Sequence, residues 1–296
     1  MHDGFKLYYE TCGPPDGVPL FLVAGSGEQI GSVEFPNEQC SLFVEHGFRV
    51  IRMDNRDAGL SVPITQLPDI NMREALAQGS AFSPVPYNRM EMADDIVAVL
   101  DDIGIRSAHL VGASMGGFLV RWVAVRHPER VASLTIVMSG AGAAAGEDGP
   151  QFEMSVVKRL LILTERHERT KAIERNIELW RWLWGDKYPF EEDFVRTRVG
   201  YAYDRSYRPE GFARQSLSSI RSPGLWEAQK GISCPTLVVH GESDPCFNVE
   251  HALAIAGSIT GAKLWIDPRM GHIMHREQWQ DLAIKIKHLT QKGDES

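Results

Sequence analysis

The sequence predicts an α/β fold, with a mostly parallel central sheet flanked by helices and a helical insertion late in the sheet. Short apolar runs alternate with amphipathic helical patterns over residues 1–140. No strand-like run occurs in residues 141–230, and the alternation resumes over residues 231–296. Continuous apolar strands separated by helices are typical of a parallel sheet covered on both faces. We therefore expect residues 1–140 and 231–296 to form the core and residues 141–230 to form a helical cap.

Apolar runs and helical spacing define the elements before the insertion. Residues 18–25 (VPLFLVAG) and 48–54 (FRVIRMD) predict buried strands. Residues 89–105 predict a helix that stops at Gly104. Its apolar positions recur at helical spacing: Met92, Ile96, Val99, Leu100 and Ile103. Three more elements are predicted: a strand at residues 107–114, a helix at 115–131 and a strand at 133–140.

The insertion is rich in charge and in bulky aromatic side chains. The aromatic residues are Trp180, Trp182, Trp184, Tyr188, Phe190, Tyr201, Tyr203 and Tyr207. We expect most of them to pack the cap helices together and a few to line a pocket. After the insertion the predicted elements are a strand and loop at 234–245, a helix at 249–259, a strand and loop at 262–272, and a closing helix at 276–292.

Composition argues against several classes of protein. The 296 residues correspond to about two units at about 150 residues per domain, or to one large domain with an insertion. The net charge of -8 argues against non-specific nucleic-acid binding, which needs basic side chains. No apolar run approaches the roughly 20 residues of a membrane helix, and the N-terminus lacks the pattern of a signal peptide. The four cysteines show no CxxC spacing. We therefore expect a reduced, cytoplasmic protein with no nucleic-acid or membrane partner.

A candidate nucleophile lies in the segment Gly112-Ala113-Ser114-Met115-Gly116, which reads G-x-S-x-G. It stands between a predicted strand and a predicted helix, the setting in which a sharp turn presents a serine at the edge of a sheet. Glycines two residues to either side leave room for that turn. The alternative is that Ser114 only caps the helix. The strand–turn–helix context favours the nucleophile.

A serine nucleophile needs a histidine base and an acid that orients the histidine. After this type of turn, both partners follow the serine on loops behind later strands. Asp244 lies in the loop after TLVVHG, with Glu242 as a rival acid earlier in the turn, and His272 lies in the loop after KLWID. A metal pair of His272 and His275 is the alternative, but no further ligand stands at suitable spacing. We expect a Ser114–His272–Asp244 triad, no cofactor and no metal.

Acyl transfer also needs N–H donors for the oxyanion of its tetrahedral intermediate. The N–H of Met115, directly after the serine, is one expected donor. The other is expected from the turn after the first buried strand, where Ser26 is favoured and Gly25 is the alternative. The residues that we expect to line the substrate pocket are Gly25, Trp184, Tyr203 and His240.

Five motifs together resemble the α/β-hydrolase superfamily. They are VAGSGEQ, DNRDAGLS, GASMGG, GESDP and RMGH. The resemblance extends from about Phe5 to Leu289. Asp57 in the second motif, together with SMGG, is similar to the esterase group that contains aclacinomycin methylesterase. The resemblance implies the α/β-hydrolase fold and a serine hydrolase. Asp54 and Arg56 of the second motif are interpreted as a structural charge pair.

These features predict a carboxylic-ester hydrolase that works through an acyl-enzyme and acts on a small ester with an apolar or aryl group. A serine in place of an aspartate nucleophile argues against the haloalkane dehalogenases and epoxide hydrolases of this fold. Three enzymatic alternatives use the same triad: a C–C hydrolase acting on a vinylogous diketone, a lactonase and a cofactor-free haloperoxidase. A ligand-binding module with a vestigial triad is the alternative from another class. The sequence predicts neither the physiological substrate nor the oligomeric state.

Overall fold

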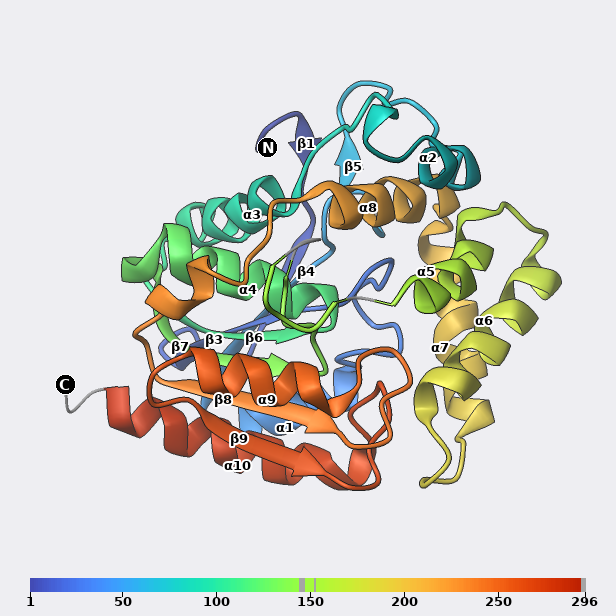
Figure 1. The fold of residues 1–296 in the computed structure, drawn as a ribbon. Helices are drawn as coiled ribbons and strands as arrows, with labels where there is room; N and C mark the ends of the chain where they lie inside the picture. The colour runs from blue at the N-terminus through green and yellow to red at the C-terminus, as the bar shows by residue number, and fades with distance from the viewer. Residues whose placement is uncertain (144–146, 152, 294–296) are drawn as a thin grey trace.

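A seven-stranded sheet forms the centre of the computed structural model, which describes residues 1–143, 147–151 and 153–293 (Figure 1). Its strands, in the order in which they lie side by side, are β2 (Tyr9–Cys12), β4 (Phe48–Met53), β3 (Val18–Val23), β6 (Ala108–Ala113), β7 (Val131–Val137), β8 (Thr236–Gly241) and β9 (Lys263–Asp267). β2 is antiparallel to β4, and the other neighbouring pairs are parallel. A separate two-stranded sheet contains β1 (Phe5–Lys6) and β5 (Val62–Pro63).

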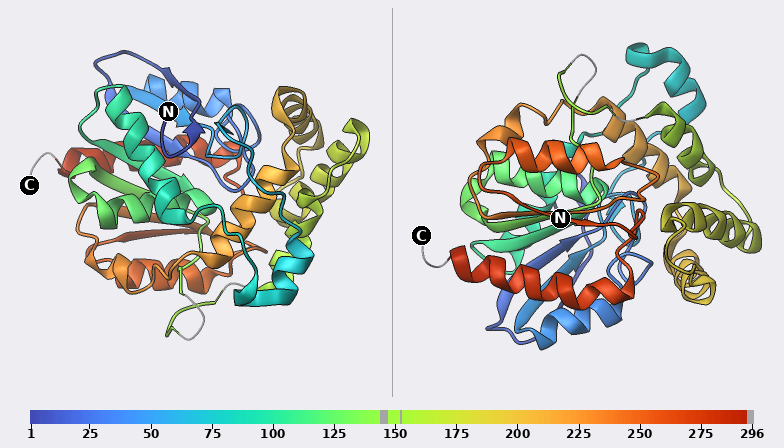
Figure 2. Two further views of the ribbon diagram at one scale, coloured as in Figure 1. Left: turned by 90° about the horizontal axis from the view of Figure 1, so that it is seen from above. Right: turned by 60° about the horizontal axis from the view of Figure 1, so that its bottom comes forward.

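Both faces of the sheet are buried, because successive side chains of a strand point to opposite sides. In β3, Phe21 and Val23 pack into the core on one face, and Leu20 and Leu22 pack into the core on the other. The helices that cover the first face are α3 (Arg89–Asp102), α4 (Met115–Arg126) and α9 (Val249–Ser258), and those on the second are α1 (Asn37–Glu45) and α10 (Arg276–Gly293) (Figure 2). The predicted α/β fold is confirmed.

Every core strand and helix that the sequence predicts has a counterpart in the structure, with ends that shift by a few residues. The helix predicted at 115–131 ends at Arg126. His127 leaves the helical region, with φ -137° and ψ 57°, because it precedes Pro128. Apolar patterning does not reveal β2, because this edge strand is half exposed and carries no continuous apolar run.

Helices fill the insertion between β7 and β8. They are α5 (Met154–Leu160), α6 (Arg169–Trp184), α7 (Glu192–Ser206) and α8 (Pro209–Arg221). Figures 1 and 2 show them beyond the ends to which the arrows of β8 and β9 point. As predicted, no strand interrupts the described part of this segment. Among the residues that the structure describes, no helix is both long and apolar enough to cross a membrane.

Buried ion pairs connect the insertion to the core. Asp54 Oδ2 lies 2.7 Å from Nη1 of Arg205 on α7, and its two oxygens also accept backbone N–H bonds from Ile30 and Leu60. Arg56 does not pair with Asp54, so that prediction is wrong. Its Nε lies 2.6 Å from Oδ2 of Asp95 on α3. Asp54 and Arg56 therefore hold two different elements, α7 and α3.

Candidate active site

A strained turn presents Ser114 between β6 and α4. Its φ of 51° and ψ of -116° lie outside the regions that side-chain-bearing residues usually adopt. A Cβ on Gly112 would lie 2.3 Å from the carbonyl oxygen of Gly116, and one on Gly116 would lie 2.0 Å from that of Val23. Atoms cannot approach each other this closely, so residues 112 and 116 must be glycine for the turn to form. Ser114 makes no side-chain cap to α4, so the capping alternative is not supported.

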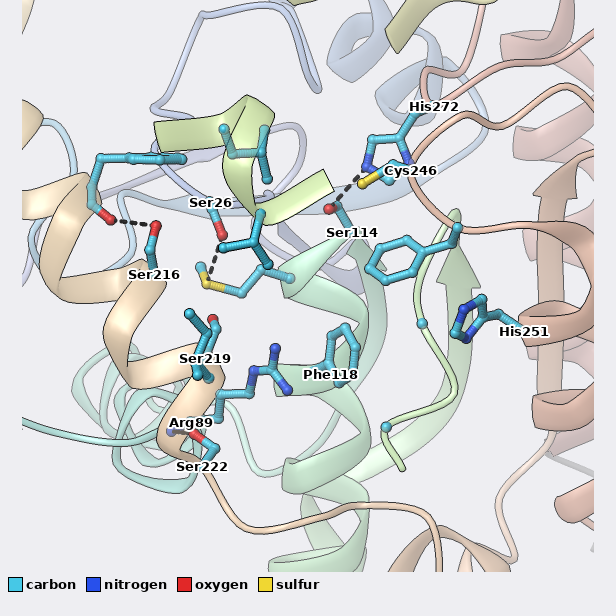
Figure 3. Close-up of a pocket in the computed structure, with 18 of the residues that line it drawn as sticks. Ser26, Arg89, Ser114, Phe118, Ser216, Ser219, Ser222, Cys246, His251 and His272 are labelled. Atoms are coloured by element: carbon cyan, nitrogen blue, oxygen red, sulfur yellow. Dashed lines mark hydrogen bonds between the residues drawn. The ribbon is translucent and has the colours of Figure 1, made fainter. Parts of the chain in front are cut away.

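Three side chains form a hydrogen-bonded series at this turn. Nε2 of His272 lies 3.0 Å from Oγ of Ser114 (Figure 3). Its Nδ1 lies 2.8 Å from Oδ2 of Asp244. A carboxylate can only accept, so the hydrogen of the neutral ring belongs on Nδ1. Nε2 is then free to accept the proton of the serine hydroxyl. The structure therefore brings together the three residues that the sequence nominates as a triad, in the geometry of nucleophile, base and orienting acid.

The loop around Asp244 holds its carboxylate in one orientation. Oδ1 accepts the backbone N–H of Cys246 at 2.7 Å and that of Phe247 at 2.9 Å, which leaves Oδ2 for His272. Glu242, the rival acid, is exposed. His240 is fully buried, and its Nε2 lies 2.9 Å from the carbonyl oxygen of Phe247. His240 therefore supports the acid loop and does not line the pocket, which corrects its predicted place.

Two buried carboxylates surround the oxyanion turn. Oε2 of Glu34 accepts the N–H of Gly25 at 2.7 Å, and Oε2 of Glu28 accepts the N–H of Val33 and of Glu34 itself, each at 3.1 Å. Burial, reinforced by the charge of Glu28, raises the pKa of Glu34 to about 7. Because the N–H of Gly25 is already bonded, Gly25 is not available as an oxyanion donor.

The backbone N–H groups of Ser26 and Met115 remain as donors. Across the described ranges, neither donates a hydrogen bond to another protein group. Both residues line the cavity that contains Ser114, and Oγ of Ser26 lies 3.2 Å from Sδ of Met115. Ser26 and Met115 stay the predicted oxyanion donors.

The electrostatic environment of His272 favours its charged form. Burial lowers its pKa, but the charge and hydrogen bond of Asp244 and the charge of Glu34 raise it, so that its pKa lies above the usual value. Such a ring readily takes up the proton of a hydroxyl nucleophile. The arrangement can therefore generate a serine alkoxide and stabilise the oxyanion that follows its attack on a carbonyl.

A cavity of about 330 Å³ opens above Ser114. Its apolar walls come from both the core and the insertion and include Phe118, Leu179, Trp180, Leu183, Phe212 and Phe247. Trp184, Tyr203, His240 and Gly25, which the sequence nominates for the pocket, are absent from this lining.

Packing explains why two of these aromatic residues lie elsewhere. Trp184 ends α6, where its ring lies 4.8 Å from that of His275 and its Nε1 donates to the carbonyl of Pro189. The ring of Tyr203 stacks on that of Tyr207 with centroids 4.5 Å apart. Tyr203 lines a smaller neighbouring cavity of about 100 Å³. Assigning Trp184 and Tyr203 to the pocket was wrong, because side chains on the same helices can face other helices.

Sequence reasoning also missed polar residues of the cavity. Glu28, Glu34 and Arg89 all line it. Glu28 and Glu34 lie in the loop after the oxyanion turn, where two acids within an otherwise uncharged stretch were the available signal. Arg89 stands at the first position of a predicted amphipathic helix, where a charged residue is unremarkable. No sequence signal distinguishes it.

The described ranges contain no group of three His, Cys, Asp or Glu side chains that could hold a metal ion. His275, the proposed partner of His272 in a metal pair, lies among aromatic rings. Its ring centroid lies 4.0 Å from that of Tyr188. Burial lowers the pKa of His275 to about 4, so it is a neutral packing residue at ordinary pH.

Comparison with known proteins identifies the family of the fold. The model of the α/β-hydrolase fold family matches residues 18–277. The chain is 27% identical to rhodomycin D methylesterase DnrP of Streptomyces peucetius, over 96% of this chain and 95% of that protein. It is 25% identical to 2-hydroxy-6-oxo-6-phenylhexa-2,4-dienoate hydrolase of Comamonas testosteroni, over 97% and 92%.

Solved structures show the same fold. An esterase from Exiguobacterium antarcticum superposes with a TM-score of 0.75 at 20% identity, over 97% of this chain and 96% of that one. The enol-lactonase of Burkholderia xenovorans LB400 superposes with a TM-score of 0.73 at 19% identity, over 98% of each chain. The chain therefore belongs to the α/β-hydrolase fold family.

Proposed function

We propose that this protein hydrolyses a carboxylic ester through an acyl-enzyme intermediate. The observation that carries the proposal is the hydrogen-bonded series Ser114–His272–Asp244, which opens into an apolar cavity beside the free N–H groups of Ser26 and Met115. The likeness to a methylesterase over almost the whole chain supports an ester as the substrate.

The geometry supports the following sequence of steps. Oγ of Ser114 attacks the ester carbonyl while Nε2 of His272 takes the hydroxyl proton. The N–H groups of Ser26 and Met115 bind the oxyanion. His272 then passes the proton to the leaving alkoxide, and the alcohol departs. A water molecule, deprotonated by His272, attacks the acyl-enzyme and releases the acid, which restores Ser114. Asp244 orients the ring throughout and stabilises its charged form.

A substrate panel tests the proposal against its alternatives. p-Nitrophenyl esters of graded acyl length are offered beside a vinylogous diketone, because relatives include a C–C hydrolase. Turnover of the esters supports the proposal. Cleavage of the diketone alone would assign C–C hydrolysis, and tight binding without turnover of either would assign a binding module.

Exchanging Glu34 for glutamine is expected to move the acidic limb of the kcat/KM profile to lower pH. His272 is a base only when neutral, so activity falls as the pH drops through its pKa. The negative charge of Glu34 raises the pKa of His272, so removing this charge lowers the pKa of His272. The amide oxygen of Gln can still accept the N–H of Gly25. Glu129→Gln, at an exposed site, is the control. Identical profiles for both variants would contradict this coupling.

Two tryptophans of α6 are expected to differ in their effect on substrate choice. Trp180 lines the cavity, whereas Trp184 packs against His275, three residues after His272. Trp180→Phe should change the relative kcat/KM among esters of different acyl length. Trp184→Phe loses the bond to Pro189 and should lower the melting temperature, with activity reduced alike for all esters. An ester series measured beside thermal unfolding checks both. Equal loss across the series for Trp180→Phe would remove it from the pocket.

A further inference from the structure

The cavity beside Ser114 contains a cation that forms no ion pair with any residue that the structure describes. Arg89, at the start of α3, lines this cavity (Figure 3). Its guanidinium carbon lies 3.9 Å from the centroid of the Phe118 ring, and its Nε is buried without a hydrogen-bond partner. Burial lowers the pKa of Arg89 to about 10, and no acidic group within the described ranges counteracts this effect. The side chain therefore stays charged at neutral pH without compensation from the protein.

A second unsatisfied group lines the same cavity. Oγ of Ser219, on α8, is buried and has no partner within the described part of the chain. Two nearby serines differ. Ser216 on α8 donates to the carbonyl of Phe212, and Ser222, directly after α8, donates to that of Ser218. Figure 3 shows Ser219 and Arg89 at the end of the cavity away from His272. Two independent groups there lack partners.

A second buried arginine adds to the positive potential. Arg121, on α4, donates to the carbonyl oxygens of Gly117, Ala141 and Gly140 and to the side chains of Ser139 and Gln229. Its hydrogen bonds are therefore complete, but its acceptors are all neutral. Burial and the charge of Arg89 together lower the pKa of Arg121 to about 9. Buried charges without a counter-ion are costly, so an anion bound here would be strongly favoured.

We propose that Arg89 and Ser219 form an anion subsite that binds a carboxylate carried by the substrate, away from the bond that is cleaved. This inference rests on the proposed ester hydrolysis. A planar guanidinium pairs with a carboxylate through two hydrogen bonds, and a serine hydroxyl supplies one more donor. The preferred substrate is then the half-ester of a dicarboxylic acid, or another ester with a remote acidic group.

The distribution of charge in the cavity orients such a substrate. Glu28 and Glu34 line it on the side of the oxyanion turn, where they disfavour a second carboxylate. Phe118, over which Arg89 lies, is four residues after Ser114 on α4, about one helical turn or ~5.4 Å along the axis. A carboxylate at Arg89 therefore leaves the scissile ester at Ser114 when several bonds separate the two groups.

The test compares monomethyl esters of glutaric, adipic and suberic acids with their neutral amides, in which an amide replaces the free carboxylate. Methanol release gives kcat/KM for each. The wild-type protein should prefer the acid of the best-fitting length by roughly 10- to 100-fold, the usual range for hydrogen bonds to charged groups. Arg89→Met should abolish this preference, so that acid and amide are turned over with equal kcat/KM. Arg89→Lys, which keeps the charge but not the planar fork, should retain part of it.

Matched variants separate a binding role from a structural one. Arg181→Met, at an exposed position of α6, should keep the full preference for the acid. Ser219→Ala should weaken the preference without lowering the melting temperature. Arg89→Met should also leave the melting temperature unchanged or raise it, because an uncompensated buried charge is removed. A loss of stability together with an equal loss for acid and amide would make Arg89 a packing residue and overturn the subsite.

The experiments distinguish a failure of the proposed subsite from a failure of the proposed ester hydrolysis. If the wild-type protein hydrolyses acids and amides equally, the subsite is overturned and ester hydrolysis stands. If no ester is hydrolysed, calorimetric titration of the wild-type protein with adipate tests the subsite alone. Binding that Arg89→Met abolishes would support the subsite, and absence of binding by the wild-type protein would overturn it.

Discussion

Replacing Ser114 by alanine is expected to lower kcat for ester hydrolysis by about 10⁶-fold, the usual cost of losing a triad nucleophile. The hydroxyl lies 3.0 Å from Nε2 of His272 at the floor of the cavity. Ser26 also lines the cavity, but its hydroxyl donates to Sδ of Met115 and not to a histidine. Cys246 lines the same cavity near His272 (Figure 3), but burial raises the pKa of its thiol well above the usual value, so the thiol stays protonated. Among the described residues of the cavity, Ser114 is therefore the group placed for the attack.

Stability and covalent labelling provide the controls for this variant. Alanine should tolerate the strained turn as serine does, because both carry a Cβ and Ser114 makes no capping bond. The melting temperature should therefore stay close to that of the wild-type protein. A fluorophosphonate should add once to the wild-type protein, at Ser114, and not to the variant. Activity above a few per cent in a folded variant would mean that another nucleophile operates.

The core and the Ser114–His272–Asp244 arrangement were predictable because the physical constraints on them are local. Parallel strands buried on both faces require continuous apolar runs, which are visible in the sequence. The nucleophile turn requires glycine at positions 112 and 116, because any side chain would collide with a carbonyl oxygen. Asp244 and His272 follow strands directly, so the order of strands in the sheet places them near Ser114.

The walls of the cavity were not predictable, because they depend on how the cap helices pack. Trp180 and Trp184 stand one turn apart on α6, but only Trp180 lines the cavity. Trp184 lies at the end of the helix, close to the loop that contains Gly271 and His272. A Cβ on Gly271 would lie only 2.4 Å from the carbonyl oxygen of Trp184. Arg89 carries no local signal of its position, because the cavity that it lines is completed by residues of α6 and α8, which are distant in the sequence.

Asp244 is the residue whose exchange for asparagine should be most informative about His272. Oδ1 of Asp244 accepts the N–H groups of Cys246 and Phe247. In an asparagine, the amide oxygen must take this place, because an amino group cannot accept these bonds. The NH₂ group then faces Nδ1 of His272 and donates to it. This forces the hydrogen of the ring onto Nε2, where it blocks acceptance of the proton of Ser114.

Asp244→Asn is therefore expected to lower kcat by about 10⁴-fold, through the wrong tautomer and a less stabilised imidazolium. The fold should persist, since the same bonds hold the loop and the two side chains have the same shape. Activity should recover only in part on raising the pH, because deprotonation of other groups does not restore the tautomer. Glu242→Gln is the matched control, and its exposed side chain predicts wild-type rates. A mild effect of Asp244→Asn beside a severe effect of Glu242→Gln would transfer the role of the acid to Glu242.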